Sequence, residues 1–352
     1  MINCALIGYG YWGQILSQRL ITQDGFRLKY ICDLDYDKFL LKSLGVKDHF
    51  IFGDLRDQPI LIQNSKQIFA DPLIEVVFIA TPPKSHYQLA YQALTNGKHV
   101  WLEKPGTTSL AEYMALQNLA IKQSCLLYVD FIVLFEPWYR YLKSRSSFDK
   151  KQTLRVLSVR ETIGAQGLDQ SKTESDAIEL LYDLAVHDLS VLKSLFPRLD
   201  AKSIAVEYSR FSEHLALPVN QMEQMGLEAQ SQSRHVLNLD SCDFQAKVLI
   251  DRKAHRKVRY CQIGSSIYYL SNQDHCWYHV DQGIEDSEHI EDLALSKQAA
   301  SKVQAIPQAS PQQIDSLGLA LLNFYDALRG LRQVNDNVDI AKFVHQILDQ
   351  CS

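Results

Sequence analysis

An apolar segment at the start of the chain runs directly into a glycine motif, and this junction constrains the fold more than any other feature. Residues 2–7 read INCALI, and Gly8, Gly10 and Gly13 then form the pattern G-x-G-x-x-G. In a strand–turn–helix unit, the first glycine permits the tight turn, the second lets the backbone approach a pyrophosphate, and the third lets the helix pack closely on the sheet. The helix then directs its unpaired N–H groups at the phosphates. The motif therefore predicts a dinucleotide-binding fold that begins at residue 2.

An acidic residue at the end of the next strand strengthens this prediction. Glycine-rich turns also occur without a ligand, so the glycine motif alone leaves a simple turn as an alternative. Here a second apolar strand, 27–32, ends in Asp33, which follows Gly13 by twenty residues. A carboxylate at that position accepts hydrogen bonds from a ribose 2′-hydroxyl and repels a 2′-phosphate. We therefore expect nicotinamide dinucleotide binding, with NAD preferred over NADP.

The composition is typical of a globular protein. Of the 352 residues, 46% are hydrophobic and 22% are charged, and the net charge is −5. The basic segments are short, so we expect no nucleic-acid partner. The longest apolar run, 126–135, is interrupted by Asp130 and is too short to cross a membrane. No basic segment followed by an apolar one stands at the start, so we expect no secretory signal and a cytoplasmic protein.

The seven cysteines predict neither disulfides nor a metal site. They are odd in number, are scattered among apolar segments and form no C-x-x-C pair. This distribution is typical of reduced, buried thiols in a cytoplasmic protein.

The order of the expected elements predicts an α/β chain with two domains, which its length also favours. Up to residue 134, apolar strands alternate with helices, a pattern that indicates a parallel sheet covered on both faces, as in a Rossmann domain. Residues 135–352 predict a second α/β domain with an open, mostly antiparallel sheet. Its expected elements are strands at 154–163, 203–211, 236–239, 246–250, 258–263 and 267–270, an apolar helix at 176–196, loop or irregular helix at 281–309, and C-terminal helices at 311–329 and 337–350.

Lys104 is the first candidate for chemistry. It lies in Glu103-Lys104-Pro105, directly after the strand 99–102, and ligands bind at the carboxyl ends of strands in such sheets. One interpretation is structural, because a lysine can extend along the surface or pair with Glu103. The other is functional: the ammonium group hydrogen-bonds a substrate hydroxyl that loses its proton as hydride leaves.

Asp183 and His187 form the second candidate. They are four residues apart on the expected helix, so their side chains lie on one face. The leucines around them indicate a largely buried helix, and a buried Asp–His pair can relay a proton near neutral pH. The alternative is a pair that stabilises the helix without touching a substrate. We expect no metal site, because no third ligand stands at a useful spacing.

Taken together, four motifs resemble the glucose–fructose oxidoreductase and inositol dehydrogenase family (Gfo/Idh/MocA). The match covers nearly the whole chain and is strongest up to about residue 196. The motifs, in chain order, are G-x-G-Y-W-G at 8–13, A-T-P-P-x-x-H-Y at 80–87, G-K-H-V-x-x-E-K-P at 97–105 and D-x-x-x-H-D at 183–188. The resemblance implies an N-terminal Rossmann domain, a C-terminal α/β domain with an open sheet, and an active site between them.

The resemblance also implies roles for particular residues. The lysine, aspartate and histidine of the family's motifs map onto Lys104, Asp183 and His187, which would bind and deprotonate a sugar or polyol hydroxyl while hydride moves to the nicotinamide. We favour His187 as the base, with Asp183 orienting its ring and Lys104 polarising the oxygen, and the reverse assignment of the base stays open. The implied cofactor-binding residues are Gly8, Gly10, Tyr11, Trp12, Gly13, Asp33, Thr81, Pro82, His86, Glu103 and Lys104.

Shorter strings resemble one branch of the family. This branch acts on nucleotide sugars and includes the UDP-N-acetylglucosamine and UDP-N-acetylglucosaminuronate 3-dehydrogenases. The similar segments are G-Y-W-G at 10–13 and L-L-Y-D-L-A-V-H-D-L-S at 180–190. The chain departs from that pattern at Asp130, where the family usually has glycine at the end of the sixth strand. The similarity to this branch nevertheless predicts a sugar or nucleotide sugar as the substrate.

Two other functions remain open at this point. One is an NAD(P)H-dependent reductase of a non-sugar carbonyl on the same scaffold. The other is a non-catalytic NAD-sensing regulator, which would have no need for the proton-transfer residues. An open sheet leaves a broad face that subunits often pair through, so we expect a homodimer or homotetramer.

Overall fold

The protein is described by a computed structural model, which divides it into two units, each with its own sheet. One unit comprises residues 1–135 and 314–345, and the other comprises residues 136–313 and 346–352. Within these units the structure describes residues 1–35, 58–145, 152–158, 183, 185–213, 232–241, 244–251, 259–263, 266–270, 276–280, 303–306 and 314–351.

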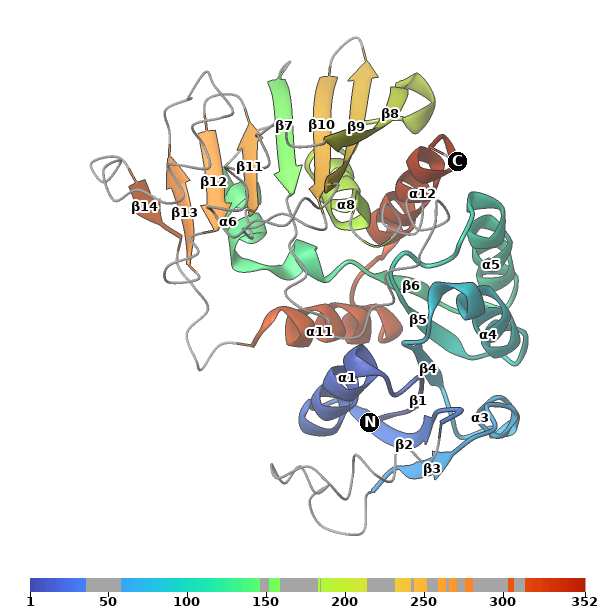
Figure 1. Cartoon of the computed structure of the whole chain (residues 1–352). Coiled ribbons are helices and arrows are strands. Elements are labelled where there is room, and N and C mark those ends of the chain that lie inside the picture. The colour runs from blue at the N-terminus through green and yellow to red at the C-terminus, as the bar shows by residue number, and fades with distance from the viewer. Residues whose placement is uncertain are drawn as a thin grey trace, which may run out of the picture. The chain divides into compact units, whose positions relative to one another are not determined.

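The first unit contains a six-stranded sheet in the order β3-β2-β1-β4-β5-β6, with every neighbouring pair parallel (Figure 1). This is the strand order of a dinucleotide-binding Rossmann fold, and it confirms the fold class expected from the sequence. The strands are β1 Ile2–Ile7, β2 Phe26–Cys32, β3 Ile60–Ile62, β4 Val76–Ile79, β5 His99–Glu103 and β6 Leu127–Asp130. The helices are α1 Tyr11–Thr22, α3 Lys66–Ala70, α4 Pro83–Thr95 and α5 Leu110–Lys122, followed by the short η2 Ile132–Phe135.

Helix α11, Ser316–Leu328, packs on the sheet of the first unit (Figure 1). The ring of Phe324 lies 6.0 Å from that of Phe78 and 5.3 Å from that of Trp101, between ring centroids. The sequence places this helix in the expected domain 135–352, whereas its contacts in the structure are with the sheet of the first unit. The apolar stripe of the helix shows that one face is buried, but the stripe does not say which sheet it covers.

The last two helices also differ in their bounds from the expectation. Helix α11 begins at Ser316 because the side chain of Asp315 accepts a hydrogen bond of 2.7 Å from the backbone N–H of Gly318, which caps the helix. The expected start at 311 lies outside the described residues. Helix α12 spans Asn335–Asp349, and the division between the two units falls within it, after His345.

The second unit contains an eight-stranded sheet in the order β14-β13-β12-β11-β7-β10-β9-β8 (Figure 1). All neighbours are antiparallel except β7 and β10, so the open, mostly antiparallel sheet is confirmed. The strands are β7 Gln152–Ser158, β8 Ala205–Glu213, β9 Gln232–Ser241, β10 Phe244–Asp251, β11 Arg259–Ile263, β12 Ser266–Leu270, β13 Trp277–Val280 and β14 Val303–Ala305. The helices are α6 Pro137–Arg145 and α8 Val186–Leu195, with the short η4 Ala201–Ser203.

The sequence did not predict strand β13 or its neighbour, the edge strand β14. Both are short, four and three residues long, so an alternating pattern has too few positions to be visible. Strand β14 falls within the segment 281–309 that we expected to be loop or irregular helix. The pairing of β14 with β13, and of β13 with β12, therefore came only from the assembled sheet.

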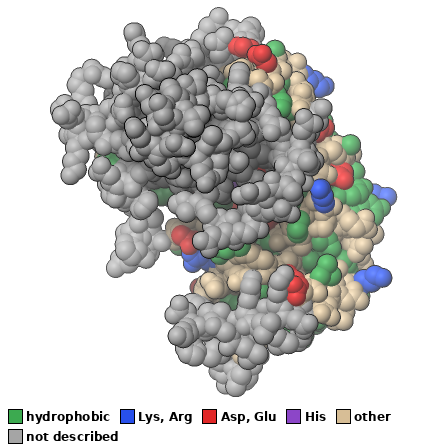
Figure 2. Space-filling model, viewed as in Figure 1, with side chains coloured by type: hydrophobic (Ala, Val, Ile, Leu, Met, Phe, Trp, Pro, Cys, Tyr) green, Lys and Arg blue, Asp and Glu red, His purple; other side chains and the backbone are tan. Residues whose placement is uncertain are grey.

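The surface of the described residues carries small hydrophobic groups. Figure 2 shows them over α4 and α5, with isolated Lys and Arg side chains among them. Exposed apolar side chains here include Tyr91 and Ile121. Scattered groups of this kind are normal on protein surfaces and do not mark an interface by themselves. Among the described helices, none combines the length and the apolar character that a membrane crossing needs.

The contact of α11 with the parallel sheet leads to a stability prediction. Phe324 is fully buried against aromatic rings of the sheet, whereas Leu322 on the same helix is 39% exposed. Phe324→Ala should lower the free energy of unfolding by about 3–5 kcal/mol, and Leu322→Ala should change it by less than about 1 kcal/mol. Urea unfolding followed by tryptophan fluorescence measures both values. Similar losses in the two variants would contradict the packing of α11 on this sheet.

Candidate cofactor and active site

The glycine motif forms the turn between β1 and α1. Gly8 has a φ of +96°, which side chains rarely adopt, and a Cβ there would lie 2.4 Å from the carbonyl oxygen of Ala80. A Cβ at Gly13 would lie 2.1 Å from the carbonyl oxygen of Gly8, so glycine at 13 allows α1 to approach the turn. A Cβ at Gly10, in contrast, would meet no atom within 4 Å. The first and third glycines are thus required by packing, and the second borders open space.

The start of α1 fits a dinucleotide pyrophosphate. The N-cap residue is Gly10, no side chain caps the helix, and the first turn carries no acidic residue. The N–H groups of a first turn have no partners within the helix and carry partial positive charge, so they suit phosphate oxygens. Tyr11 and Trp12 are the first two residues of this turn.

Asp33 lies beside the same turn. It is half-buried, directly after β2, and its Oδ2 accepts a hydrogen bond of 2.6 Å from the backbone N–H of Tyr9. Its Oδ1 accepts a second bond of 2.9 Å from the backbone N–H of Asp35. The structure therefore brings the acidic residue and the glycine turn together, as the fit to an adenosine ribose requires.

His86 lies between two loops at the carboxyl end of the parallel sheet. Its side chain is fully buried, with Nε2 2.7 Å from the carbonyl oxygen of Thr81 and Nδ1 3.1 Å from that of Gly106. Two carbonyl acceptors favour a ring that is protonated on both nitrogens, which would raise the pKa of His86. Burial has the larger effect and lowers this pKa, so the neutral ring is favoured. His86 thus ties the loop after β4 to the loop after β5, and we assign it a positioning role. Pro82, next to Thr81, is the N-cap residue of α4.

The Glu103-Lys104-Pro105 segment lies at the carboxyl end of β5, as expected. Lys104 is half-buried, and the carboxylate of Glu103 accepts a hydrogen bond from the indole N–H of Trp12. This bond joins the E-K-P segment to the first turn of α1. Both residues are expected cofactor ligands, and their spacing in the sequence gives no sign of a bond between them.

A histidine of α12 holds the loop that follows Lys104. His345 is fully buried, and its Nδ1 lies 2.7 Å from the carbonyl oxygen of Ala341, so Nδ1 carries the proton. Its Nε2 then accepts a hydrogen bond of 3.2 Å from the backbone N–H of Thr107. The ring also stacks on Tyr113, with 4.8 Å between ring centroids. Sequence reasoning missed His345, because more than 200 residues separate it from the loop that it holds.

Asp130 places a second carboxyl group beside Glu103. The two residues are register partners at the ends of β5 and β6, and Asp130 is only 1% exposed. Burial raises the pKa of Asp130 to about 7. Burial, together with the charge of Asp130, also raises the pKa of Glu103 well above its usual range. The sequence contains a sign of this pair, because each of two successive parallel strands ends in an acidic residue.

The second unit contains the other pair of candidate residues. His187 lies in α8, where eight of the ten residues are buried, and it is 7% exposed. Asp183 is exposed, so the expectation of a pair buried at both residues is corrected. Residues 176–182 and 184 of the expected helix lie outside the described residues. Lys104 belongs to the first unit and His187 to the second. The described residues contain no cluster of three or more potential metal ligands.

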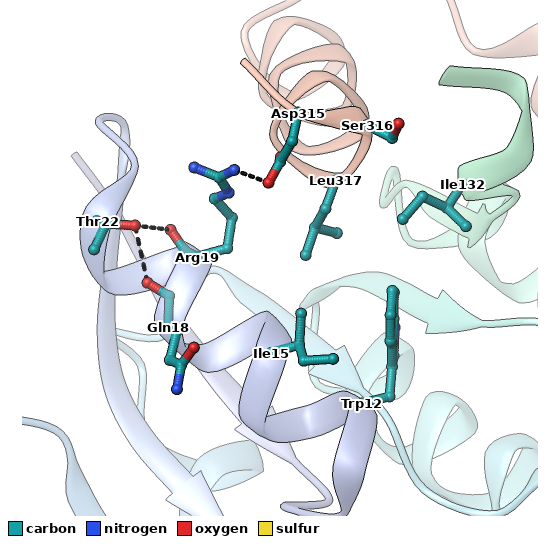
Figure 3. A pocket seen from close by; sticks show the side chains of 9 residues that line it. All are labelled: Trp12, Ile15, Gln18, Arg19, Thr22, Ile132, Asp315, Ser316 and Leu317. Atoms are coloured by element: carbon teal, nitrogen blue, oxygen red, sulfur yellow. Dashed lines mark hydrogen bonds and ion pairs between the residues drawn. The ribbon is translucent and has the colours of Figure 1, made fainter. Parts of the chain in front are cut away.

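A cavity of about 460 Å³ lies beside Trp12 in the first unit. Figure 3 shows the side chains of Trp12, Ile15, Ile132 and Leu317 around it, with an ion pair between Arg19 and Asp315 at one side. The walls therefore come from α1, η2 and the start of α11. Trp12 contacts both this cavity and Glu103.

Two substitutions in the glycine turn should separate packing from ligand approach. Gly13→Ala should lower the free energy of unfolding by about 1–3 kcal/mol, because its Cβ would clash with the backbone of Gly8. Gly10→Ala should change it by less than about 0.5 kcal/mol, since the site is open and φ is −68°. It should still weaken NADH binding, because the methyl group would occupy the path of the pyrophosphate.

Urea unfolding and NADH fluorescence titration measure the two effects. An equal loss of stability in both variants would contradict the different packing of the two glycines. Unchanged NADH affinity in Gly10→Ala would show that the cofactor does not pass this point.

The comparisons with known proteins agree with this geometry for the first unit. Residues 2–131 match the model of GFO_IDH_MocA, the oxidoreductase family with an NAD-binding Rossmann fold. The scyllo-inositol 2-dehydrogenase (NAD⁺) of Bacillus subtilis is 23% identical over 197 residues, which are 55% of this chain and 54% of that enzyme. For the first three curated relatives, the match spans 28% to 54% of their own length.

Two solved structures resemble almost the entire chain. The UDP-N-acetylglucosamine 3-dehydrogenase GnnA from Acidithiobacillus ferrooxidans has a TM-score of 0.68 at 17% identity, over 99% of this chain and 96% of that one. Biliverdin reductase from Synechocystis sp. PCC 6803, in complex with biliverdin and NADP⁺, has a TM-score of 0.71 at 16% identity, over 99% and 98%. At these identities the likeness shows the fold alone. The fold, the glycine turn and the match over residues 2–131 agree that the first unit is similar to the NAD-binding Rossmann domain of the Gfo/Idh/MocA oxidoreductase family.

Proposed function

We propose that the chain is an NAD-dependent dehydrogenase that transfers hydride between a sugar hydroxyl carbon and the nicotinamide, with a nucleotide sugar as the substrate. The observation that carries the proposal is the position of Lys104 at the carboxyl end of β5, in a segment bonded to the first turn of α1 through Glu103 and Trp12. The glycine turn and the side chain that would donate a hydrogen bond to the substrate are thus joined within the first unit. The similarity to a scyllo-inositol dehydrogenase and to a UDP-N-acetylglucosamine dehydrogenase supports a polyol or sugar as substrate.

The residues of the first unit would bind the cofactor and the hydroxyl oxygen. The first turn of α1 would hold the pyrophosphate, and Asp33 would accept hydrogen bonds from the adenosine ribose. The bound nicotinamide supplies the acceptor or donor of hydride. Lys104 would donate a hydrogen bond to the hydroxyl oxygen and stabilise the negative charge that develops there as the C–H bond breaks.

The residues of the second unit would handle the proton. His187 is the proposed base, because an imidazole can accept a proton near neutral pH. Its place in the apolar helix α8 limits contact with water, which strengthens its interactions with nearby charges. The carboxylate of Asp183 would favour the imidazolium that forms after proton transfer.

A single-turnover assay tests the proposal directly. Protein at high concentration with NAD⁺ is mixed with UDP- and dTDP-sugars, free sugars and inositols, and nicotinamide fluorescence is recorded. NADH formed in proportion to enzyme with one nucleotide sugar is the expected result. If the cofactor binds but no compound reduces it, the nucleotide-sugar proposal is wrong, and a non-sugar carbonyl reductase or a non-catalytic NAD sensor becomes the better hypothesis.

The proposed roles of Lys104 as hydrogen-bond donor and of His187 as base lead to a kinetic prediction. Lys104→Ala and His187→Ala should each lower kcat by about two orders of magnitude or more, with NADH affinity nearly unchanged. Lys122→Ala removes an exposed lysine at the end of α5 and should leave kcat within about twofold, so it is the matched control. Stopped-flow turnover and NADH titration give both quantities. Wild-type turnover in both active-site variants would remove these residues from the mechanism.

Asp33 should determine the choice between NAD and NADP. Its carboxylate sits at the glycine turn, where a 2′-phosphate would be repelled. Asp33→Asn keeps an oxygen acceptor for the Tyr9 N–H and loses the charge, so it should shift the ratio of NADPH to NADH affinity toward NADPH by about tenfold. Asp33→Ala should also weaken NADH. Fluorescence titration measures the ratio, and an unchanged ratio in both variants would mean that another residue reads the ribose.

Two further expectations depend on the second unit and on the cell. A homodimer or homotetramer that pairs through the open sheet stays a prediction from the sequence, as does the cytoplasmic location. The cytoplasmic location is compatible with the proposed function, because a dehydrogenase of a nucleotide sugar acts on a freely diffusing substrate.

A further inference from the structure

Two carboxyl groups lie side by side at the edge of the sheet where ligands bind. Glu103 is the last residue of β5, Asp130 is the last residue of β6, and the parallel register pairs them directly. Neighbouring strands are about 4.8 Å apart, and paired residues point to the same face of the sheet. The two carboxyl groups are therefore neighbours by construction of the sheet.

The surroundings of Asp130 do not suit a carboxylate ion. Both of its carboxyl oxygens are buried, and no donor among the described residues bonds to either one. Glu103 accepts one bond from Trp12 and has the other acid as its neighbour. An ionised Asp130 would lack both hydration and donors, and it would repel an ionised Glu103, which is half-buried. Two carboxyl groups can form a hydrogen bond with each other only if one of them carries a proton.

We propose that Asp130 and Glu103 share one proton, and that Asp130 is thereby a positioning residue for Lys104. The shared proton leaves one negative charge on the pair, which balances the single positive charge of the adjacent ammonium group. Loss of that proton adds a second negative charge beside Lys104 and draws its ammonium group toward the pair, away from the substrate oxygen. The role assigned to Lys104 rests on the proposed function, whereas the shared proton does not.

The titration of the pair agrees with this geometry. Burial raises the pKa of Asp130 to about 7 and raises the pKa of Glu103, while the positive charge of Lys104 lowers both. The other titratable groups near the pair are Tyr128 on β6, whose hydroxyl accepts a hydrogen bond from Asn323 of α11, and His86 of α4, whose pKa the charge of Lys104 lowers. From α1, Trp12 contributes a neutral donor.

The shared proton can be measured on the protein alone. Infrared difference spectra between pH 5 and pH 9 should contain the carbonyl band of a protonated carboxyl group that disappears near neutral pH in the wild type. Asp130→Asn should abolish this band, and Glu103→Gln, as a second variant, should do the same. Glu75→Gln removes an exposed carboxylate before β4 and should leave the band in place. Absence of the band in the wild type, or its persistence in both pair variants, would overturn the shared proton.

The pH dependence of the free energy of unfolding should also depend on this shared proton. The pKa of Asp130 is raised in the folded state, so its contribution to stability is present below about pH 4 and is lost as the pH rises toward 7. The difference in urea midpoint between wild type and Asp130→Asn should therefore move in favour of Asp130→Asn between pH 5 and pH 8. A difference that does not vary with pH would contradict the raised proton affinity.

The positioning role is tested separately by the pH profile of kcat. In the wild type, kcat should fall as the pair loses its proton, and Asp130→Asn should move this alkaline limb upward by about one pH unit or more. An unmoved limb, with the infrared band assigned as expected, would overturn the positioning role and keep the shared proton. If no substrate turns over at all, the proposed function fails, and the infrared result still decides whether the proton is shared.

Discussion

A fully parallel sheet must be covered on both faces, and the first unit of this protein depends on that constraint. All four residues of β4 are buried, and the apolar runs of the neighbouring strands are continuous enough to require partners above and below. Part of the cover comes from α11, which arrives from the end of the chain and places Phe324 against the rings of Phe78 and Trp101. The Rossmann sheet is therefore completed by residues that follow segment 136–313 of the second unit in sequence.

The same parallel arrangement collects the chemistry at one edge. Because every strand runs in the same direction, the glycine turn, Asp33, the loop at Thr81 and the Glu103-Lys104-Pro105 segment all leave the sheet at its carboxyl ends. Buried side chains then fix these loops to one another. His86 bonds two of the loops, and Trp12 joins the glycine turn to Glu103. A cofactor and a substrate hydroxyl would meet groups that are already held in place, which is how an enzyme limits reorganisation during the reaction.

The charges of the ionisable groups at this edge depend on one another. Lys104 follows Glu103 in the chain and Glu103 lies beside the buried Asp130, so three ionisable groups, two of them half-buried, lie close together. Electrostatic effects in such a place are stronger than on a surface, and a single proton changes the net charge seen by a bound substrate. The departure from glycine at residue 130 thus gives this chain an acid pair next to its proposed catalytic lysine.

Local patterns in the sequence determined much of the first unit. The spacing of Gly8, Gly10 and Gly13 predicted the turn, and Asp33 was placed next to it from its distance along the chain. The alternation of strands and helices predicted a parallel sheet, and the longer strands after it predicted the second, mostly antiparallel one. These features depend on backbone conformation and on periodicity, which act over a few residues and are visible without the fold.

Only the tertiary structure decided which distant segments meet. It placed α11 on the first sheet, set His345 against the loop after Lys104, and buried His86 between two loops. It also exposed Asp183 and paired Asp130 with Glu103. Burial and pairing of this kind depend on contacts between residues tens to hundreds of positions apart. The sequence of one element shows that a face is apolar or that a group is ionisable. The packing of the whole unit determines which element covers that face and which charged group lies beside that ionisable group.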